Sequence, residues 1–363
     1  MACPLSAALG GAEKDRDQDT CRWLARMLAR AVLLVAGAAA GNLAASGAGQ
    51  AQALDKVSFA TNWVAEAEHG GFYQALADGT YRRYGLDVTI VPGGPQVNNR
   101  LLLAAGRIDF YLSANTVQSL DAVSENIPTL AVAAMFQKDP QALLTHPDRG
   151  VTGPSDLKGM TLYVSKEGMA TYFLWLKAFY GIGDDRVRPY TSNPQPFLAD
   201  RNSAMQAYVT SEPFAIERAS GMKPAVMLLA DYGFDPYSTL IETRRDVVAT
   251  RPAVVQRFVD ASIIGWYNYI YHDNAAANDL IKRQNPEMTD DLLAWSVKQL
   301  RNYGIVDSGD AVELGIGAMS EARVRAFYDK MVAAGVVKAG LDWRRSYTLQ
   351  FVNRKVGTEL RPK

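Results

Sequence analysis

The chain has 363 residues, of which 48% are hydrophobic and 21% are charged, a composition typical of a globular protein with one large domain or two domains. Its 38 basic residues balance 38 acidic ones, which argues against a nucleic-acid-binding protein, and its apolar content argues against a disordered chain. Only two cysteines and three histidines occur, so a tetrahedral zinc site is nearly excluded.

The N-terminal segment has the pattern of an export signal. Residues 31–45 form an apolar run that is shorter than the roughly 20 residues a membrane-spanning helix needs. Arginines precede this run, and Ala51-Gln52-Ala53 follows it. The order predicts a cleaved signal peptide over residues 1–53, with a membrane anchor or a buried helix as the alternative. Met27 is an alternative start that would give a more compact signal.

Removal of this segment would leave residues 54–363 with a net charge of −1. Both cysteines, Cys3 and Cys21, lie in the removed part, so the mature chain would have neither a disulfide nor a thiol nucleophile. Neither cysteine follows the apolar run, which argues against a lipid anchor. An exported, cysteine-free, soluble protein fits the bacterial periplasm, and we expect the protein there.

Short apolar runs alternate with helical patterns in two successive units, which predicts an α/β architecture with parallel sheets. Strands are expected at 57–60, 86–91, 108–112 and 129–136 in the first unit, and at 142–145, 160–164, 187–190, 207–210, 225–229 and 238–242 in the second. Helices are expected between them at 71–84, 97–105, 116–124, 168–180 and 212–219.

The last third of the chain is almost entirely helical in pattern. Thr250 as a cap and Pro252 in the first turn predict a helix that runs to about Tyr271. The aromatic residues along 258–271 are expected to serve the core. Further helices are expected at 274–284, 289–303 and 319–334. No linker separates the two units, so we expect them to pack side by side, with the helical part closing over one of them.

The loop after the first strand carries several side chains that can contact a ligand. In open α/β sheets, ligands bind beyond the carboxyl ends of strands. Trp63 could stack on a planar ligand, while the polar groups of Asn62, Glu66 and His69 could bond to its edge. The helix start at Gly70-Gly71 would offer free backbone N–H groups. The alternative is a loop whose Trp63 and His69 only pack against the neighbouring helix.

Two more strand ends in the first unit carry candidates. Asn115 follows the third strand and is either a ligand contact or the N-cap of the next helix. Phe136 and Lys138 stand at the end of the fourth strand. Lys138 has a solvated surface charge as its alternative role.

The second unit repeats this arrangement. Ser165 follows a strand and opens a helix, and Tyr208 stands in a similar place. Glu212 would accept hydrogen bonds from an amino group of a ligand, or would serve as an acid in a helix first turn. Tyr232 is a weaker candidate at a later strand end.

The sequence lacks the common motifs of catalysis. It has no G-x-S-x-G or H-E-x-x-H pattern, no phosphate-binding loop and no dinucleotide-binding glycine pattern. We therefore expect no catalytic residue, no metal site and no cofactor.

Four segments together resemble the NMT1/THI5-like group of bacterial extracellular solute-binding proteins, which serve ABC importers. They are YRRYGLDVTIVPGG (81–94), AAGRIDFYLSANT (104–116), SDLKGMTLYVS (155–165) and TRPAVVQRFVDASIIGWY (250–267). The resemblance implies a type II periplasmic-binding-protein-like fold, in which two α/β domains are joined by two crossing strands around a ligand cleft. It places domain I at 54–143 plus 239–363 and domain II at 144–238.

The resemblance also implies a function. The loop from Asn62 to Gly71 is similar to the loop by which pyrimidine-binding, thiamine-precursor members hold their ligand. We expect a monomeric periplasmic protein that binds a small planar nitrogen heterocycle, namely a pyrimidine, and delivers it to an ABC permease. Alternative ligands are a sulfonate, nitrate, taurine or a riboflavin-type molecule. Alternative functions are a periplasmic sensor that binds a receptor instead of a permease, and an enzyme with His69 as base. The eukaryotic enzymes of this group use a cysteine-rich iron motif that is missing here.

Overall fold

The computed structural model describes residues 53–94 and 97–362. The expected signal peptide lies outside this part except for Ala53, and it stays a prediction. None of the helices in the described ranges combines the length and the apolar character needed to cross a bilayer.

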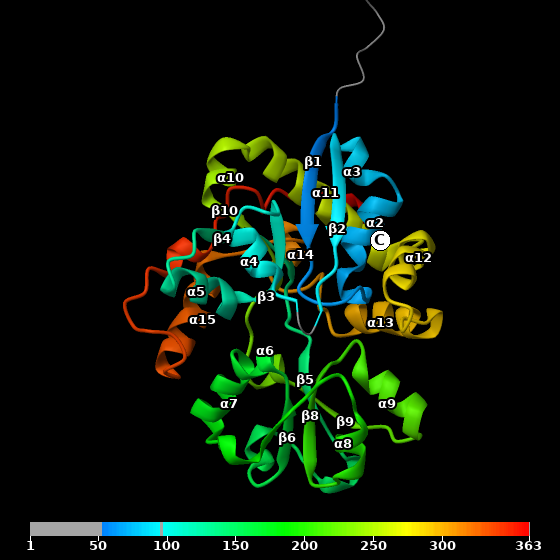
Figure 1. The fold of residues 1–363 in the computed structure, drawn as a ribbon, viewed down its shortest axis with the longest axis vertical. Helices are drawn as coiled ribbons and strands as arrows, with labels where there is room; N and C mark the ends of the chain where they lie inside the picture. Colours follow the sequence, from blue (N-terminus) through cyan, green and yellow to red (C-terminus); the bar gives the residue numbers. More distant parts are fainter. Residues whose placement is uncertain (1–52, 95–96, 363) are drawn as a thin grey trace, which may run out of the picture. The chain divides into compact units, whose positions relative to one another are not determined.

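The first sheet is mixed, with the strand order β2-β1-β3-β10-β4 (Figure 1). Its strands are β1 (Asp55–Ala60), β2 (Leu86–Val91), β3 (Phe110–Asn115), β4 (Thr129–Phe136) and β10 (Ser238–Arg244). β1 pairs in parallel with β2 and β3, whereas β10 lies antiparallel between β3 and β4. The expectation of a parallel sheet is therefore wrong at β10, because this strand returns from the second sheet and enters in the opposite direction.

The second sheet follows the same plan, with the order β7-β6-β8-β5-β9. Its strands are β5 (Gln141–Thr145), β6 (Thr161–Val164), β7 (Val187–Pro189), β8 (Ser203–Tyr208) and β9 (Ala225–Leu228). β5 is antiparallel to both of its neighbours. The chain thus passes between the sheets twice, once before Gln141 and once before Ser238, which confirms the two crossing strands.

Helices cover both sheets (Figure 1). The α-helices are α2 (Gly70–Ala77), α3 (Thr80–Arg83), α4 (Asn99–Ala104), α5 (Thr116–Ser124), α6 (Lys166–Met169), α7 (Tyr172–Tyr180), α8 (Gln195–Ala199), α9 (Glu212–Ser220), α10 (Arg245–Thr250), α11 (Pro252–Tyr271), α12 (Ala275–Gln284), α13 (Asp290–Asn302), α14 (Ala311–Leu314) and α15 (Glu321–Ala333). Short 3-10 turns are η1 (Ala67–His69), η2 (Pro147–Arg149), η3 (Pro154–Leu157), η4 (Asp184–Arg186), η5 (Leu229–Tyr232), η6 (Trp343–Ser346) and η7 (Thr358–Leu360). We call the β1–β4 and β10 sheet with α2–α5 and α10–α15 the first lobe, and the β5–β9 sheet with α6–α9 the second lobe.

Local chemistry explains where the expected helices differ from the observed ones. The helix expected at 71–84 is broken because Gly79 adopts a left-handed φ of +75°. The carboxylate of Asp78 then accepts a hydrogen bond from the Thr80 backbone N–H at 2.9 Å, which starts α3. Thr250 is not the cap of α11, because it is the last residue of α10 and its hydroxyl donates to the Asp246 carbonyl at 2.7 Å.

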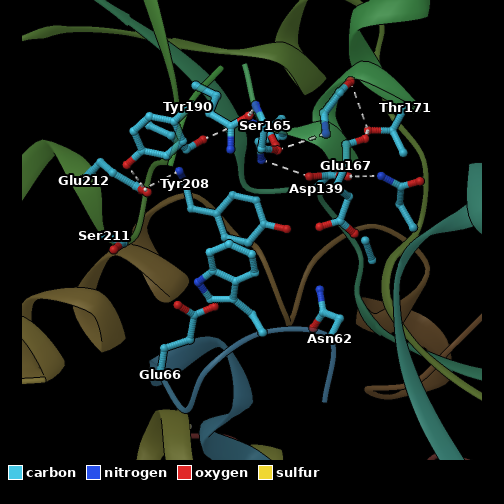
Figure 2. Close-up of a pocket in the computed structure, with 17 residues that line it drawn as sticks. Asn62, Glu66, Asp139, Ser165, Glu167, Thr171, Tyr190, Tyr208, Ser211 and Glu212 are labelled. Carbon is cyan, nitrogen blue, oxygen red and sulfur yellow. Dashed lines mark hydrogen bonds between the residues drawn. The ribbon is translucent and has the colours of Figure 1, made fainter. Parts of the chain in front are cut away.

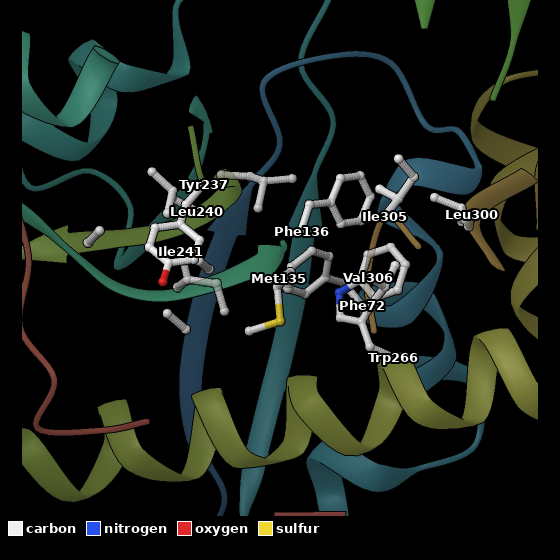
Figure 3. Packing of buried hydrophobic residues seen from close by; sticks show 14 of the residues in the cluster. Phe72, Met135, Phe136, Tyr237, Leu240, Ile241, Trp266, Leu300, Ile305 and Val306 are labelled. Carbon is white, nitrogen blue, oxygen red and sulfur yellow. The ribbon is translucent and has the colours of Figure 1, made fainter. Parts of the chain in front are cut away.

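The central core lies between the first sheet and α11, and Figure 3 shows its aromatic centre. Trp266 of α11 contacts the rings of Phe72 and Phe136 edge to face, at centroid distances of 5.9 and 5.2 Å. Phe258 stacks on Phe110 of β3 at 4.2 Å. The aromatic residues of α11 therefore form core, as expected, and each such pair contributes roughly 0.5–1.5 kcal/mol beyond burial.

Candidate functional site

A cavity of about 80 Å³ lies between the carboxyl ends of strands from both lobes. Figure 2 shows side chains from the loop after β1 facing others that follow β6 and β8. Seven of the predicted residues line it: Asn62, Trp63, Glu66, Asn115, Ser165, Tyr208 and Glu212. These residues are far apart in the sequence, and strand ends that converge between the lobes bring them together.

Two of these residues also fix the local backbone. The side-chain oxygen of Asn115 accepts a hydrogen bond from the Val117 N–H at 3.1 Å, and that of Ser165 accepts one from the Gly168 N–H at 3.0 Å. Both are thus helix N-caps, for α5 and α6. Asn115 therefore has the capping role that the sequence left open, and it also lines the cavity, while its contact with a ligand stays a prediction.

The other four predicted residues do not line the cavity. His69 is buried behind the first loop, where its Nε2 lies 3.4 Å from the Asn62 side-chain oxygen. Phe136 belongs to the core beside Trp266. The remaining two make contacts elsewhere: the ammonium of Lys138 is 2.7 Å from the Asp231 carboxylate, and the Tyr232 hydroxyl donates to the Thr152 carbonyl at 2.8 Å.

The expectation that Gly70 and Gly71 both offer free backbone N–H groups to a ligand is wrong for Gly70. The Gly70 N–H donates to the Ala67 carbonyl within η1. A Cβ added at Gly70 or Gly71 would lie within 2.0 and 2.3 Å of the rings of Tyr269 and Trp266, respectively. These glycines are needed because α2 packs closely on α11, so their role is packing.

Sequence reasoning missed several residues that line the cavity. The most important are Asp139, Glu167, Tyr190 and Gln206. Glu167 lies two residues after the candidate Ser165, and Asp139 directly follows the candidate Lys138. The strand-end pattern located these segments, but it did not show which neighbouring side chain turns inward.

The cavity is strongly acidic. Its lining includes the carboxylates of Glu66, Asp139, Glu167 and Glu212, and no lysine or arginine. Figure 2 shows these four carboxylates distributed around the cavity. In the described ranges, no group of three or more histidine, cysteine or acidic residues has the geometry to hold a metal ion.

The hydrogen bonds of these carboxylates hold them in position. Glu212 accepts from the backbone N–H of Tyr208 at 2.8 Å and from the Tyr190 hydroxyl at 3.4 Å. Asp139 accepts from the Gln141 N–H at 2.9 Å and from the Asn115 amide at 3.2 Å. Glu212 is thus oriented by residues of the second lobe, and Asp139 is oriented by Gln141 at the start of β5 and by Asn115 of the first lobe.

Burial raises the pKa of every carboxyl in the cavity. It raises the pKa of Asp139 to about 7 and that of Glu66 well above its usual value, where the nearby Glu68 and Glu212 charges add to the effect. The pKa values of Glu167 and Glu212 are also raised, mainly by burial. A ligand that donates hydrogen bonds or carries positive charge would compensate these buried acids.

Burial has the opposite effect on the neighbouring imidazole. It lowers the pKa of His69 to about 3, so this histidine is neutral in the physiological range. The neutral His69 ring thus lies next to the Asn62 side-chain amide and adds no charge to the cavity.

Hydrogen bonds also join the two lobes around the cavity. The Gln118 amide of α5 donates to the Glu167 carboxylate of α6 at 3.0 Å. On the other side, the Thr210 hydroxyl donates to the carboxylate of Glu68 in η1. The Ser296 hydroxyl of α13 donates to the Thr210 carbonyl at 2.6 Å. These contacts hold the lobes together on two sides of the cavity.

We expect the ligand-free protein to lose stability as the pH rises from 5 to 8. Burial raises the pKa of Glu68 from 4.5 to about 7, so the folded state binds this proton more tightly than the unfolded chain does. The resulting stabilisation is full below the unfolded pKa and is lost as the pH rises through about 7. Asp139 contributes with the same sign. The total effect is on the order of a few kcal/mol.

Thermal unfolding between pH 5 and 8 measures this loss, and Glu68→Gln should reduce it because glutamine does not titrate. Glu125→Gln, at an exposed position, is the matched control and should leave the pH dependence unchanged. An equal pH dependence in the wild type and in Glu68→Gln would contradict the assignment.

Comparisons with known proteins agree with this architecture. The Riboflavin-binding protein RibY of Chloroflexus aurantiacus is 23% identical over 311 residues, covering 82% of this chain and 86% of its own. The Formylaminopyrimidine-binding protein of Halalkalibacterium halodurans is 23% identical over 241 residues, covering 64% of this chain and 72% of its own.

Among solved structures, the alkanesulfonate-binding protein SsuA of Xanthomonas axonopodis pv. citri, bound to MOPS, superposes with a TM-score of 0.58 at 13% identity. It covers 81% of this chain and 98% of its own, which shows that the chain has the fold of periplasmic binding proteins. The sequence pattern described as NMT1/THI5 like matches residues 66–276, more than half of the chain. The protein therefore belongs to the NMT1/THI5-like family.

Proposed function

We propose that the protein is the substrate-binding component of an ABC importer and that it encloses a planar, amino-bearing nitrogen heterocycle, most simply an aminopyrimidine. The observation that carries the proposal is a cavity between two lobes that combines aromatic rings with four carboxylates and no basic side chain. Riboflavin-binding and formylaminopyrimidine-binding relatives support a heterocyclic ligand.

The shape and chemistry of the lining favour a flat ring. Trp63 of the first lobe and Tyr208 of the second lobe both line the cavity. Aromatic side chains that approach from opposite lobes can hold a ring between them by stacking. Glu212 and Glu66 would then accept hydrogen bonds from ring or exocyclic N–H groups, and Asn62 can both donate and accept.

The same lining argues against an anionic ligand. Sulfonate and nitrate are usually bound by arginine or by several cationic donors. The cavity instead places four carboxylates around the ligand, so an anion would be repelled. The likeness to a sulfonate-binding protein, at 13% identity, shows the fold alone.

An enzyme with His69 as its base is the less favoured alternative. The imidazole does not line the cavity, and its Nε2 faces the Asn62 side chain at 3.4 Å. Incubation of a bound pyrimidine with the protein should return it unchanged, and a new product in chromatography would favour the enzyme.

We place the protein in the periplasm as a monomer that delivers its ligand to an inner-membrane permease. We take the two lobes as its domains, with the division near 143/144 and 238/239, and we assign ligand capture to closure of one lobe on the other.

A thermal-shift and calorimetry panel tests the ligand class. 4-Amino-5-hydroxymethyl-2-methylpyrimidine should stabilise the protein, by about 2.7 kcal/mol at 100 times its Kd, while taurine and methanesulfonate should not. Riboflavin is included because of the related binding protein. Stabilisation by the sulfonates without stabilisation by the pyrimidine would overturn the proposal, and binding of riboflavin alone would replace the pyrimidine by a larger ring system.

A further inference from the structure

A second and larger cavity, of about 710 Å³, adjoins the first one. The two share six lining residues: Asn62, Trp63, Ser165, Glu167, Thr171 and Tyr190. The first cavity alone is smaller than the usual 300–1,000 Å³ of a small-molecule site, whereas the second lies within that range. The second cavity is therefore additional space directly beside the proposed ligand.

The walls of this outer cavity differ in chemistry from those of the inner one. Aliphatic side chains from both lobes line it, including Val117 and Leu120 of α5, Leu174 of α7, and Val336 and Val337 after α15. Leu174 remains 37% exposed, although a leucine gains free energy when it is covered. The inner cavity is thus polar and acidic, and the outer one offers apolar surface.

Glu167 and Trp63 lie at the boundary between the two cavities. Glu167 lines both of them and accepts the hydrogen bond from Gln118 across the lobes at 3.0 Å. The ring of Trp63 also lines both cavities. A substituent on a ring held beside Trp63 would pass this boundary and reach the aliphatic wall.

We propose that the ligand is amphiphilic, with an amino-bearing ring in the inner cavity and an apolar aryl or alkyl extension in the outer cavity against Leu174 and Val337. This inference rests on the proposed function and narrows its substrate class. Arg100, Lys166 and Lys338 also line the outer cavity, so an anionic extension is the competing possibility that the experiment must distinguish.

The first experiment compares matched ligands by calorimetry. The benzyl ether of 4-amino-5-hydroxymethyl-2-methylpyrimidine should bind at least about tenfold more tightly than the parent alcohol, because its phenyl ring becomes buried. Leu174→Gln should remove this gain and leave the affinity for the parent unchanged. Leu102→Gln is the matched control, since Leu102 is a helical leucine with 38% exposure that lines neither cavity.

The outcomes separate the two proposals. Tight binding of the parent without a gain from the benzyl group, or tighter binding of its phosphate ester than of its benzyl ether, overturns the amphiphilic ligand and leaves the proposed function standing. Failure of the parent and of the ether to bind overturns the aminopyrimidine assignment.

A second measurement does not depend on ring recognition. N-phenyl-1-naphthylamine, an uncharged apolar dye, should gain fluorescence on the wild type and on Leu102→Gln, and at least about fivefold less on Leu174→Gln. Equal fluorescence on all three proteins would show that the outer cavity does not bind apolar groups, and the inference would then fail whatever the inner cavity binds.

Discussion

Glu212→Gln is expected to weaken binding of the amino-heterocycle by at least about 100-fold. The carboxylate accepts a hydrogen bond from the Tyr208 N–H at 2.8 Å, which aims the acid into the cavity. A hydrogen bond to a charged group contributes about 1.5–3 kcal/mol, and an amide would in addition turn an NH₂ donor toward a ligand donor. Together these effects reach or exceed the roughly 2.8 kcal/mol that corresponds to 100-fold.

Calorimetry with the pyrimidine measures this loss. Glu217→Gln is the matched control, because Glu217 is exposed on the same helix α9 and does not line the cavity. Thermal unfolding without ligand should show that both variants are folded. If Glu212→Gln kept the affinity of the wild type, the acid would not contact the ligand, and the proposed orientation of the ring would be wrong.

Gly265→Ala should destabilise the protein by about 3 kcal/mol, because its Cβ would lie 2.2 Å from the carbonyl oxygen of Gly71 and 2.7 Å from the Cβ of Ala75. Alanine in place of glycine within a helix normally stabilises by about 1 kcal/mol. The clash outweighs this gain, since a backbone atom of α2 cannot rotate away as a side chain can.

Urea denaturation measures the change in the free energy of unfolding. Gly94→Ala is the control, because a Cβ there would make only ordinary contacts at 3.7 Å. An unchanged stability in Gly265→Ala would mean that α2 can move away from α11 at little cost. Since α2 directly follows the loop that carries Asn62 and Trp63, such a shift would also change the affinity for the ligand.

Much of the site could be predicted because strand ends in an α/β protein are readable from the sequence. Trp63 and Glu212 were found this way, each as a polar or aromatic side chain just beyond an apolar run. Tyr232 satisfied the same rule and faces Thr152 instead, because the rule gives a side chain's place along the chain and not its direction.

Other features depend on contacts between distant segments. Gly70 and Gly71 were interpreted as a helix start open to a ligand, but their surroundings are set by Tyr269 and Trp266, about 200 residues later in the chain. The acidity of the cavity was missed for the same reason. Asp139 and Glu167 are ordinary single acids in the sequence, and only the approach of the lobes places them with Glu66 and Glu212.

The position of β10 has a consequence for the order of folding. Because β10 lies between β3 and β4, these two strands have no hydrogen-bonded partner in common until residues 238–244 have been synthesised. All five strands of the second sheet precede Ser238, so that sheet can form while the first still lacks a strand in its interior. The lobe whose strands begin first in the sequence is thus completed last, and a chain in which residues 238–244 have not yet joined the sheet exposes the edges of β3 and β4 to incorrect pairing.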